Sequence, residues 1–255
     1  MTQDRARNVV VFGASGAIAG AVAEEFVRAG DRLYLSSRQE TPPAKWRGRV
    51  VEWARVDATD IDQVDAYYAR LAEKGVVPDV VFNGIGQRAA EGGFGTPSHL
   101  LDVGRFNQTL AAVVGGQFLT ASRGARAMAK AGRGVVILLT SSLAKVSIPN
   151  MAGITAASDA VEGLARVLQA EHVQSGVRVV CARVGGMPET RMIMETMAAN
   201  ANTAGVSVDE YAQRLPASRA GTAPLTLKAA AKAIAMLASE DAAPLSFEPV
   251  NVGFA

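Results

Sequence analysis

The sequence predicts one α/β domain, a doubly wound parallel β-sheet with helices on both faces. Short apolar runs rich in β-branched residues alternate along the chain with longer segments of helical periodicity. Most of these short runs are apolar on both faces, which is the pattern of strands buried in a parallel sheet. A glycine-rich turn also joins the first strand to the first helix. Together these three observations predict the fold class.

The alternation assigns each element in order. Strands are expected over residues 9–12, 32–35, 50–53, 80–82, 135–139, 177–182 and 249–252. Helices are expected over residues 17–29, 61–74, 102–130, 154–174 and 227–239. Residues 191–220 stand outside this alternation and hold three methionines, whose adaptable apolar side chains suit a substrate-binding region. No repeat or linker divides the chain, so residues 1–255 are expected to form a single domain.

Composition and charge exclude several kinds of partner. The formal net charge of +2 comes from interspersed basic and acidic residues, so nucleic acids and membrane surfaces are not expected partners. No apolar run reaches the length of a membrane span. Cys181 is the only cysteine, so no internal disulfide forms, which favours the reducing cytoplasm. His99 and His172 have no further ligand at metal-binding spacing, so no metal site is predicted.

The turn after the first strand has the character of a phosphate cradle. It runs Gly13-Ala-Ser-Gly16-Ala-Ile-Ala19 and leads directly into a helix. Glycine lets the backbone turn sharply and approach a pyrophosphate, and the helix N-terminus offers free N–H groups and a favourable dipole. Ala19 stands where a third glycine often lies, and it is small enough to keep the helix close to the strand. The predicted contacts with a dinucleotide are Gly13, Ser15, Gly16, Ala17 and Ile18.

The end of the second strand indicates which dinucleotide is bound. An acidic residue there would accept the ribose hydroxyls of NAD. The strand ends instead in Ser37 and Arg38. The planar guanidinium of arginine is suited to a 2′-phosphate, so the sequence favours NADP over NAD.

Further motifs follow in the order found in one family. Val56-Asp57-Ala58 comes after the third expected strand, and the fourth leads into Asn83-Gly84-Ile85-Gly86. An apolar strand ends in Ser141, residues 180–190 end in Gly186-Met-Pro-Glu-Thr190, and residues 250–253 read Val-Asn-Val-Gly. With the glycine turn, these motifs resemble the short-chain dehydrogenase/reductase family almost from end to end, with Gly84 in place of the family's second Asn. The resemblance implies a Rossmann-type fold and further cofactor contacts at Asp57, Ala58, Asn83, Gly84, Ile85, Gly186 and Thr190.

The chain departs from this family where catalysis takes place. In the family, a Tyr exchanges a proton with the substrate oxygen, and a Lys four residues later lowers the pKa of that Tyr. An ungapped alignment from Ser141 to Pro149 puts Ile154 at the Tyr position and Ser158 at the Lys position. The family's catalytic Asn falls on Val113, so only Ser141 of the four catalytic positions is kept. Loss of a general acid costs on the order of 10²- to 10⁴-fold in rate.

Two ionisable residues lie near these positions in the sequence. Lys145 is in the loop after Ser141, and Asp159 directly follows Ser158. Each is a candidate proton donor. The simpler interpretations are a solvated loop lysine and a carboxylate that favours the helix N-terminus.

Three functions stay open at this stage. The first is an NADP-dependent oxidoreductase that acts on a small carbonyl or alcohol substrate through a non-standard proton path. The second is a non-redox enzyme in the same cleft, such as a cyclase, isomerase or lyase. The third is a non-catalytic nucleotide-binding or partner subunit. The resemblance also implies a homodimer or homotetramer, formed through the helices expected over residues 102–130 and 154–174.

Overall fold

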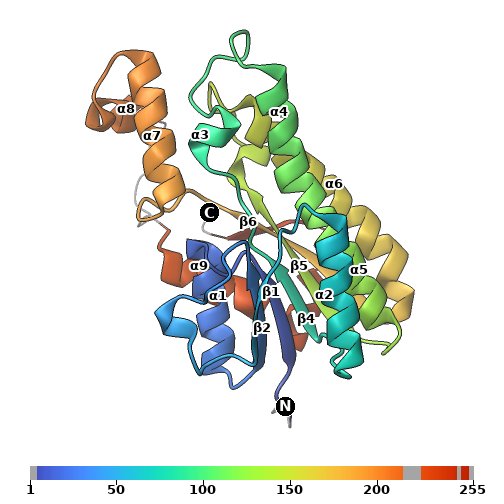
Figure 1. Cartoon of the computed structure of the whole chain (residues 1–255). Helices are drawn as coiled ribbons and strands as arrows, with labels where there is room; N and C mark the ends of the chain where they lie inside the picture. The colour runs from blue at the N-terminus through green and yellow to red at the C-terminus, as the bar shows by residue number, and fades with distance from the viewer. Residues whose placement is uncertain (1–4, 215–224, 246–247, 253–255) are drawn as a thin grey trace.

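The computed structural model describes residues 5–214, 225–245 and 248–252. These residues form a seven-stranded sheet in the order β3-β2-β1-β4-β5-β6-β7, and every neighbouring pair is parallel. The strands are β1 (Asn8–Phe12), β2 (Arg32–Ser37), β3 (Glu52–Arg55), β4 (Val80–Asn83), β5 (Gly134–Ser141), β6 (Val177–Val184) and β7 (Val250–Val252). The predicted fold class is confirmed, with helices on both faces of the sheet (Figure 1).

Two apolar cores lie between the sheet and its helices. Helices α1 and α9 pack on one face of the sheet, and α2, α5 and α6 pack on the other (Figure 1). In β1, Val9 and Val11 belong to the first core, whereas Val10 and Phe12 belong to the second. Successive side chains of a strand point to opposite faces, so an uninterrupted apolar run serves both cores. The α-helices are α1 (Ala17–Arg28), α2 (Ile61–Glu73), α3 (Ala89–Gly92), α4 (Val103–Leu110), α5 (Gly116–Ala129), α6 (Ala152–His172), α7 (Arg191–Ala204), α8 (Val208–Arg214) and α9 (Leu227–Met236).

Some observed boundaries differ from the expected ones. The third strand, expected over 50–53, is Glu52–Arg55, because the strand pairs with β2 from Glu52 onward and the apolar Val51 before it is exposed. The single helix expected over 102–130 is divided into α4 and α5 by a π-helical segment, Ala111–Gly115. Hydrophobic periodicity reports which face is buried and is insensitive to one widened turn, so it did not indicate this segment.

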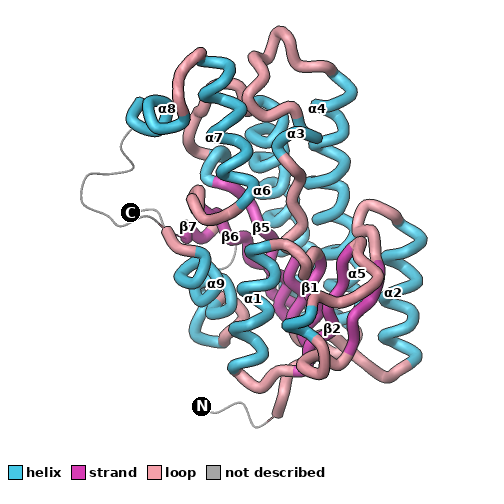
Figure 2. Tube along the Cα trace, turned by 60° about the vertical axis from the view of Figure 1, so that its left-hand side comes forward, coloured by secondary structure: helices cyan, strands magenta, loops and turns pink. Residues whose placement is uncertain are grey.

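Residues 191–214 of the predicted substrate region form α7 and α8, which project beyond the sheet beside α3 (Figure 2). Polar contacts hold α7 in place: Thr203 donates to the carbonyl of Gly95 at 2.6 Å, and Asn150 donates to the side chain of Asn200 at 3.3 Å. Residues 215–220 of that region lie outside the described residues, as does Gly253. Within the described part of the chain, no helix is long and apolar enough to cross a membrane.

Candidate functional site

The candidate site lies at the carboxyl ends of β1, β2, β4 and β5. Strands β1 and β4 are neighbours, with Phe12 opposite Asn83 where they end. From β1 the chain continues to β2, on one side of the β1–β4 pair. From β4 it continues to β5, on the other side of this pair. Ligands of open α/β sheets bind at such a reversal of strand order.

The predicted glycine turn closes tightly and leaves a helix end free. Gly13 has a φ of +75°, and a Cβ there would lie 3.3 Å from the backbone carbon of Gly84. The N–H of Gly16 donates to the carbonyl of Gly13 at 2.8 Å, and Gly16 is the N-cap residue of α1. No side chain caps α1 and no acidic residue lies in its first turn, whereas Asp60 caps α2. Ser15, Gly16 and Ala17 are exposed and Ile18 is half-buried, so the first-turn N–H groups are accessible to an anion.

Ser37 and Arg38 have different environments at the end of β2. Ser37 is buried, and its hydroxyl oxygen accepts the N–H of Gln39 at 3.0 Å. Arg38 is exposed and has no ion pair or hydrogen bond with any other described residue. Of the two side chains, that of Arg38 is therefore the one available to a phosphate.

Asp57 and Ala58 follow β3 on the same edge. The Asp57 carboxylate accepts both the N–H and the hydroxyl of Thr59, at 3.0 and 2.7 Å. This local turn uses one carboxylate oxygen, Oδ1. Ala58 is buried in the core under α2.

Asn83 holds the turn after β4 rather than presenting its amide to solvent. It is buried, and its Nδ2 donates to the carbonyl of Gly116 and to the hydroxyl of Thr120. Its Oδ1 accepts the N–H of Ile85 at 2.8 Å. Each polar atom of the Asn83 side chain thus has a partner within the protein, and the side chain fixes the backbone of residues 84–85 beside the glycine turn.

Ala19 and Gly84, which both depart from the expected motifs, lie against each other beside this turn. A Cβ placed on Gly84 would lie 2.6 Å from the Cβ of Ala19, closer than two carbon atoms can pack. Gly84 is held in place because its N–H donates to the carbonyl of Phe12 at 3.2 Å. The extra methyl of Ala19 is therefore compatible with the turn because residue 84 has no side chain.

The residues at the positions that the sequence aligned with the family's catalytic groups are apolar or internally bonded. Ile154 packs against the core that contains the buried Val113, which lies in the π-helical segment. Ser158 is buried, and its hydroxyl donates to the carbonyl of Ile154 at 2.7 Å. Ser141 is half-buried at the end of β5, and its hydroxyl oxygen accepts the N–H of Leu143 at 3.1 Å. That bond leaves the O–H of Ser141 available as a donor.

The two candidate proton donors lie in different surroundings. Lys145 is exposed and forms no ion pair with the described residues. Asp159 is exposed on α6 and lines a surface hollow of about 320 Å³ together with Ser98 and residues of the loop before α6. Neither role is tested by the geometry, and both stay predictions.

The segment after β6 folds back on itself. Thr190 is buried, and both its N–H and its hydroxyl donate to the carbonyl of Met187, at 2.9 and 2.8 Å. Met187 is buried in the core under α1 and α9. A Cβ on Gly186 would meet the side chain of Ile193 at 3.4 Å, an ordinary contact distance. The segment is thus anchored at the start of α7.

Two arginines near the site are already paired with one carboxylate. Glu195 of α7 accepts from Arg191 at 2.6 Å and from Arg88, just before α3, at 3.3 Å. The hydrogen bond from Arg191, and a further one from Arg88, lower the pKa of Glu195. These contacts tie α7 to the segment before α3, and no sequence pattern indicated them because 107 positions separate Arg88 from Glu195.

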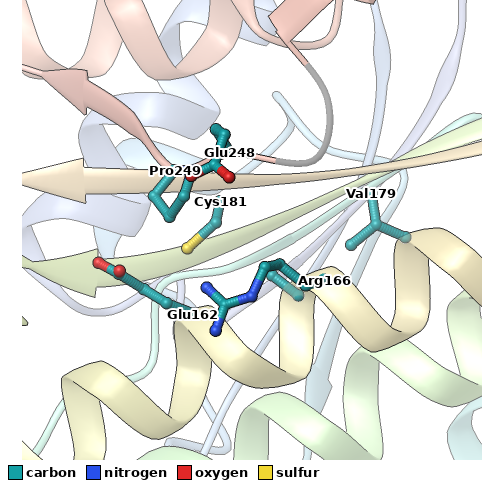
Figure 3. Close-up of a pocket in the computed structure, with 7 residues that line it drawn as sticks. Glu162, Arg166, Val179, Cys181, Glu248 and Pro249 are labelled. Atoms are coloured by element: carbon teal, nitrogen blue, oxygen red, sulfur yellow. The ribbon is translucent and has the colours of Figure 1, made fainter.

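An enclosed pocket elsewhere has the features of packing rather than of catalysis. Glu162 and Arg166 of α6 face Cys181 of β6 across a space of about 10 Å³ (Figure 3). Burial raises the pKa of Cys181 to about 12, which keeps the thiol protonated near neutral pH. Glu162 is bound by Arg183 through two hydrogen bonds of 2.7 Å, and both side chains are buried. Among the described residues, no cluster of His, Cys, Asp and Glu is suited to hold a metal ion.

Gln87 is a residue of this region that sequence reasoning missed. It follows the turn after β4 and is 7% exposed. Neither its Nε2 nor its Oε1 has a hydrogen-bond partner among the residues that the structure describes. Its position next to the turn Asn83–Gly86 was the available signal, but an amide without a partner is visible only in the folded protein.

Comparison with known proteins places the chain in a family. The family model described as short chain dehydrogenase matches residues 7–201. Cis-4-hydroxycyclohexanecarboxylate dehydrogenase of Sinomonas cyclohexanicum is 30% identical over 180 residues, which cover 68% of this chain and 70% of that protein. An inactive 2-(S)-hydroxypropyl-CoM dehydrogenase 2 of Xanthobacter autotrophicus is 29% identical, over 67% of this chain and 74% of that protein. The crystal structure of a variant actinorhodin polyketide ketoreductase with NADPH has a TM-score of 0.86 at 22% identity, and covers 99% of this chain and 97% of that one.

Proposed function

The chain belongs to the short chain dehydrogenase family, and we propose that it is an NADP-dependent oxidoreductase acting on a small carbonyl or alcohol substrate. The observation that carries this proposal is the edge formed by β1, β2 and β4. There, the tight Gly13 turn leads into an uncapped helix, and Arg38, which has no partner in the described part of the chain, follows the end of the neighbouring strand.

The residues of this edge fit a dinucleotide with a 2′-phosphate. The first turn of α1 would hold the pyrophosphate, because its N–H groups have no capping side chain and the backbone at Gly13 and Gly16 allows close approach. Arg38 would hold the 2′-phosphate through its planar fork of donors. When bound, NADP supplies the hydride acceptor or donor of the reaction.

The chain's own contribution to proton transfer differs from that of a Tyr–Lys pair. Ser141 donates its O–H to the substrate oxygen and orients it, since its oxygen already accepts from Leu143. Ile154 excludes water from the reacting carbon and exchanges no proton. The proton comes from Lys145, which follows Ser141 in the same loop and is free of ion pairs with the described residues.

The decisive experiment measures NADPH binding and turnover side by side. Calorimetric titration compares NADPH with NADH, and absorbance at the nicotinamide band follows NADPH oxidation by a carbonyl panel. Oxidation with NADP is followed using cis-4-hydroxycyclohexanecarboxylate, the alcohol in the name of one relative. Tighter binding of NADPH with turnover supports the proposal. Binding without turnover refutes the oxidoreductase activity, and no binding refutes the cofactor site.

Substitutions at the two candidate donors test the proton path. Lys145→Met is expected to lower turnover by on the order of 10²-fold or more, as for loss of a general acid. Asp159→Asn is the matched variant at the second candidate, which lines the surface hollow together with Ser98. A greater loss in the Asp159 variant would transfer the role to that residue. Equal turnover in both variants would leave water as the proton source and refute the role of Lys145.

We also propose that the chain associates with copies of itself through α5 and α6. Phe118 on α5 and Val167 on α6 are large apolar side chains that are 45% and 55% exposed. Such side chains on two long helices are typical of a surface that is covered in an oligomer. Size-exclusion chromatography with light scattering is expected to show a dimer or tetramer that Phe118→Asp weakens. A monomeric wild type would refute this proposal.

A further inference from the structure

Gln87 differs from the other buried polar side chains at the site because it has no partner. Most buried polar groups in proteins are hydrogen-bonded, and an amide that is not costs free energy in the empty protein. Among the described residues, single unpartnered atoms also occur in Trp46 and Tyr67, but these rings lie within the two cores of the sheet. In the part of the chain that the structure describes, only Gln87 has two such atoms, and it lies in the loop that follows β4.

The Gln87 amide lies near a small apolar cluster that Ile154 also contacts. A Cβ on Gly92 would lie 3.0 Å from Gln87 Oε1 and 2.4 Å from the ring of Phe94, so the glycine makes room for both. Phe94 is buried in a small cluster with Leu143, and Ile154 packs against that cluster. The amide oxygen thus lies near the cluster that Ile154 contacts, in the loop that starts at the reversal of strand order.

We propose that Gln87 binds the substrate, and that its amide pairs with two oxygen functions of a small hydroxylated compound. Nε2 donates to one oxygen, and Oε1 accepts from a hydroxyl. Two neighbouring hydroxyls of a ligand can accept a hydrogen bond from Nε2 and donate one to Oε1, so both amide atoms are paired. A single hydroxyl pairs with the two atoms less well. This inference rests on the proposed function, because it assigns a substrate class to the same site.

The amide therefore discriminates between substrates that differ by one hydroxyl. A site that hydrogen-bonds a hydroxyl rejects the analogue without it, because its buried polar atoms are then left unpaired. Cyclohexane-1,2-diol and cyclohexanol form such a pair of probes. In the presence of saturating NADP, we expect the wild type to bind the diol about tenfold more tightly than the single alcohol.

The test combines Gln87→Met with a matched variant at a second buried glutamine. Gln117 is fully buried, and both of its amide atoms are bonded to the backbone of Leu139, at 2.7 and 3.4 Å. Without ligand, Gln87→Met is expected to melt at a higher temperature than the wild type, because it removes two unpaired atoms. Gln117→Met is expected to melt at a lower temperature, because it breaks existing bonds. Chemical-shift titration then measures the affinity for each probe.

The outcomes separate this inference from the proposed function. The expected result is that Gln87→Met binds both probes with equal affinity and binds NADP as the wild type does. A Gln87→Met variant that is less stable than the wild type without ligand would show that the amide is already paired, and would overturn the inference. A wild type without preference for the diol, or a preference that survives in Gln87→Met, would also overturn it. Failure of the wild type to bind NADP would instead refute the proposed function, and the melting comparison would still decide whether the amide is paired.

Discussion

Placing a single methyl group on Gly84 is expected to destabilise the protein through its contact with Ala19. In Gly84→Ala, the new Cβ lies 2.6 Å from the Cβ of Ala19 and 3.2 Å from its Cα. Carbon atoms pack at about 3.5–4.0 Å, so the turn and α1 must separate by about 1 Å. Gly84 cannot simply retreat, because its N–H is bonded to Phe12 and the adjoining N–H is held by Asn83. Overpacking of this kind costs about 1–3 kcal/mol.

The free energy of unfolding in urea measures this contact through a double-mutant cycle. Ala19→Gly alone is expected to cost about 1–2 kcal/mol, from helix propensity and the loss of a buried methyl. The double variant Ala19→Gly/Gly84→Ala moves the methyl across the contact and removes the 2.6 Å overlap between the two Cβ atoms. Its loss of stability is therefore expected to fall about 1–2 kcal/mol short of the sum of the single losses.

A neighbouring glycine supplies the control for this cycle. A Cβ on Gly86 meets no atom within 4 Å, and its φ lies outside the left-handed region, as does that of Gly84. Gly86→Ala is expected to change stability by less than about 1 kcal/mol, or to raise it by restricting the unfolded chain. Additive losses at positions 19 and 84, within about 0.5 kcal/mol, would show that the two residues do not compensate each other and that the reasoning is wrong.

Three further predictions concern the cofactor, the catalytic position and the buried ion pair. Arg38→Ala is expected to weaken NADPH binding about tenfold or more while NADH binding changes little, because one charge-assisted contact to phosphate is lost. Calorimetry with both cofactors measures this difference, and an equal loss of affinity for NADH would contradict the prediction. Ile154→Tyr combined with Ser158→Lys supplies a Tyr–Lys proton donor, so the rate of NADPH oxidation by ketones is expected to rise by on the order of 10²-fold. An unchanged rate would show that proton transfer does not limit the reaction. Glu162→Gln leaves Arg183 buried without a counter-charge and is expected to lower the free energy of unfolding in urea by about 3–5 kcal/mol. Replacing both residues with Leu and Met is expected to cost much less stability. Equal losses of stability would argue against the unpaired charge as the cause.

The sheet and the glycine turn at its edge were readable from the sequence because their signals are local. A strand buried on both faces needs an uninterrupted apolar run, and β1 and β4 are such runs. The turn at Gly13 needs a residue that tolerates a φ of +75°, which only glycine adopts readily. Arg38 follows β2 directly, so its place at the sheet edge comes from the strand alone. The absence of a Tyr–Lys pair at positions 154 and 158 was equally visible, since it is a matter of residue identity.

The tertiary structure decided which of these residues are free and which are already bonded. Asn83 carries a family motif, yet its amide is used within the protein, while the amide of Gln87 nearby has no partner. Ala19 and Gly84 each looked like an isolated departure until the fold brought them into contact. Periodicity and turn chemistry depend on neighbours along the chain, so the sequence alone determined the order of the strands and the place of the glycine turn. Hydrogen-bond satisfaction and close packing depend on segments that are distant along the chain, such as Asn83 and Gly116 or Ala19 and Gly84, and only the folded chain brings these together.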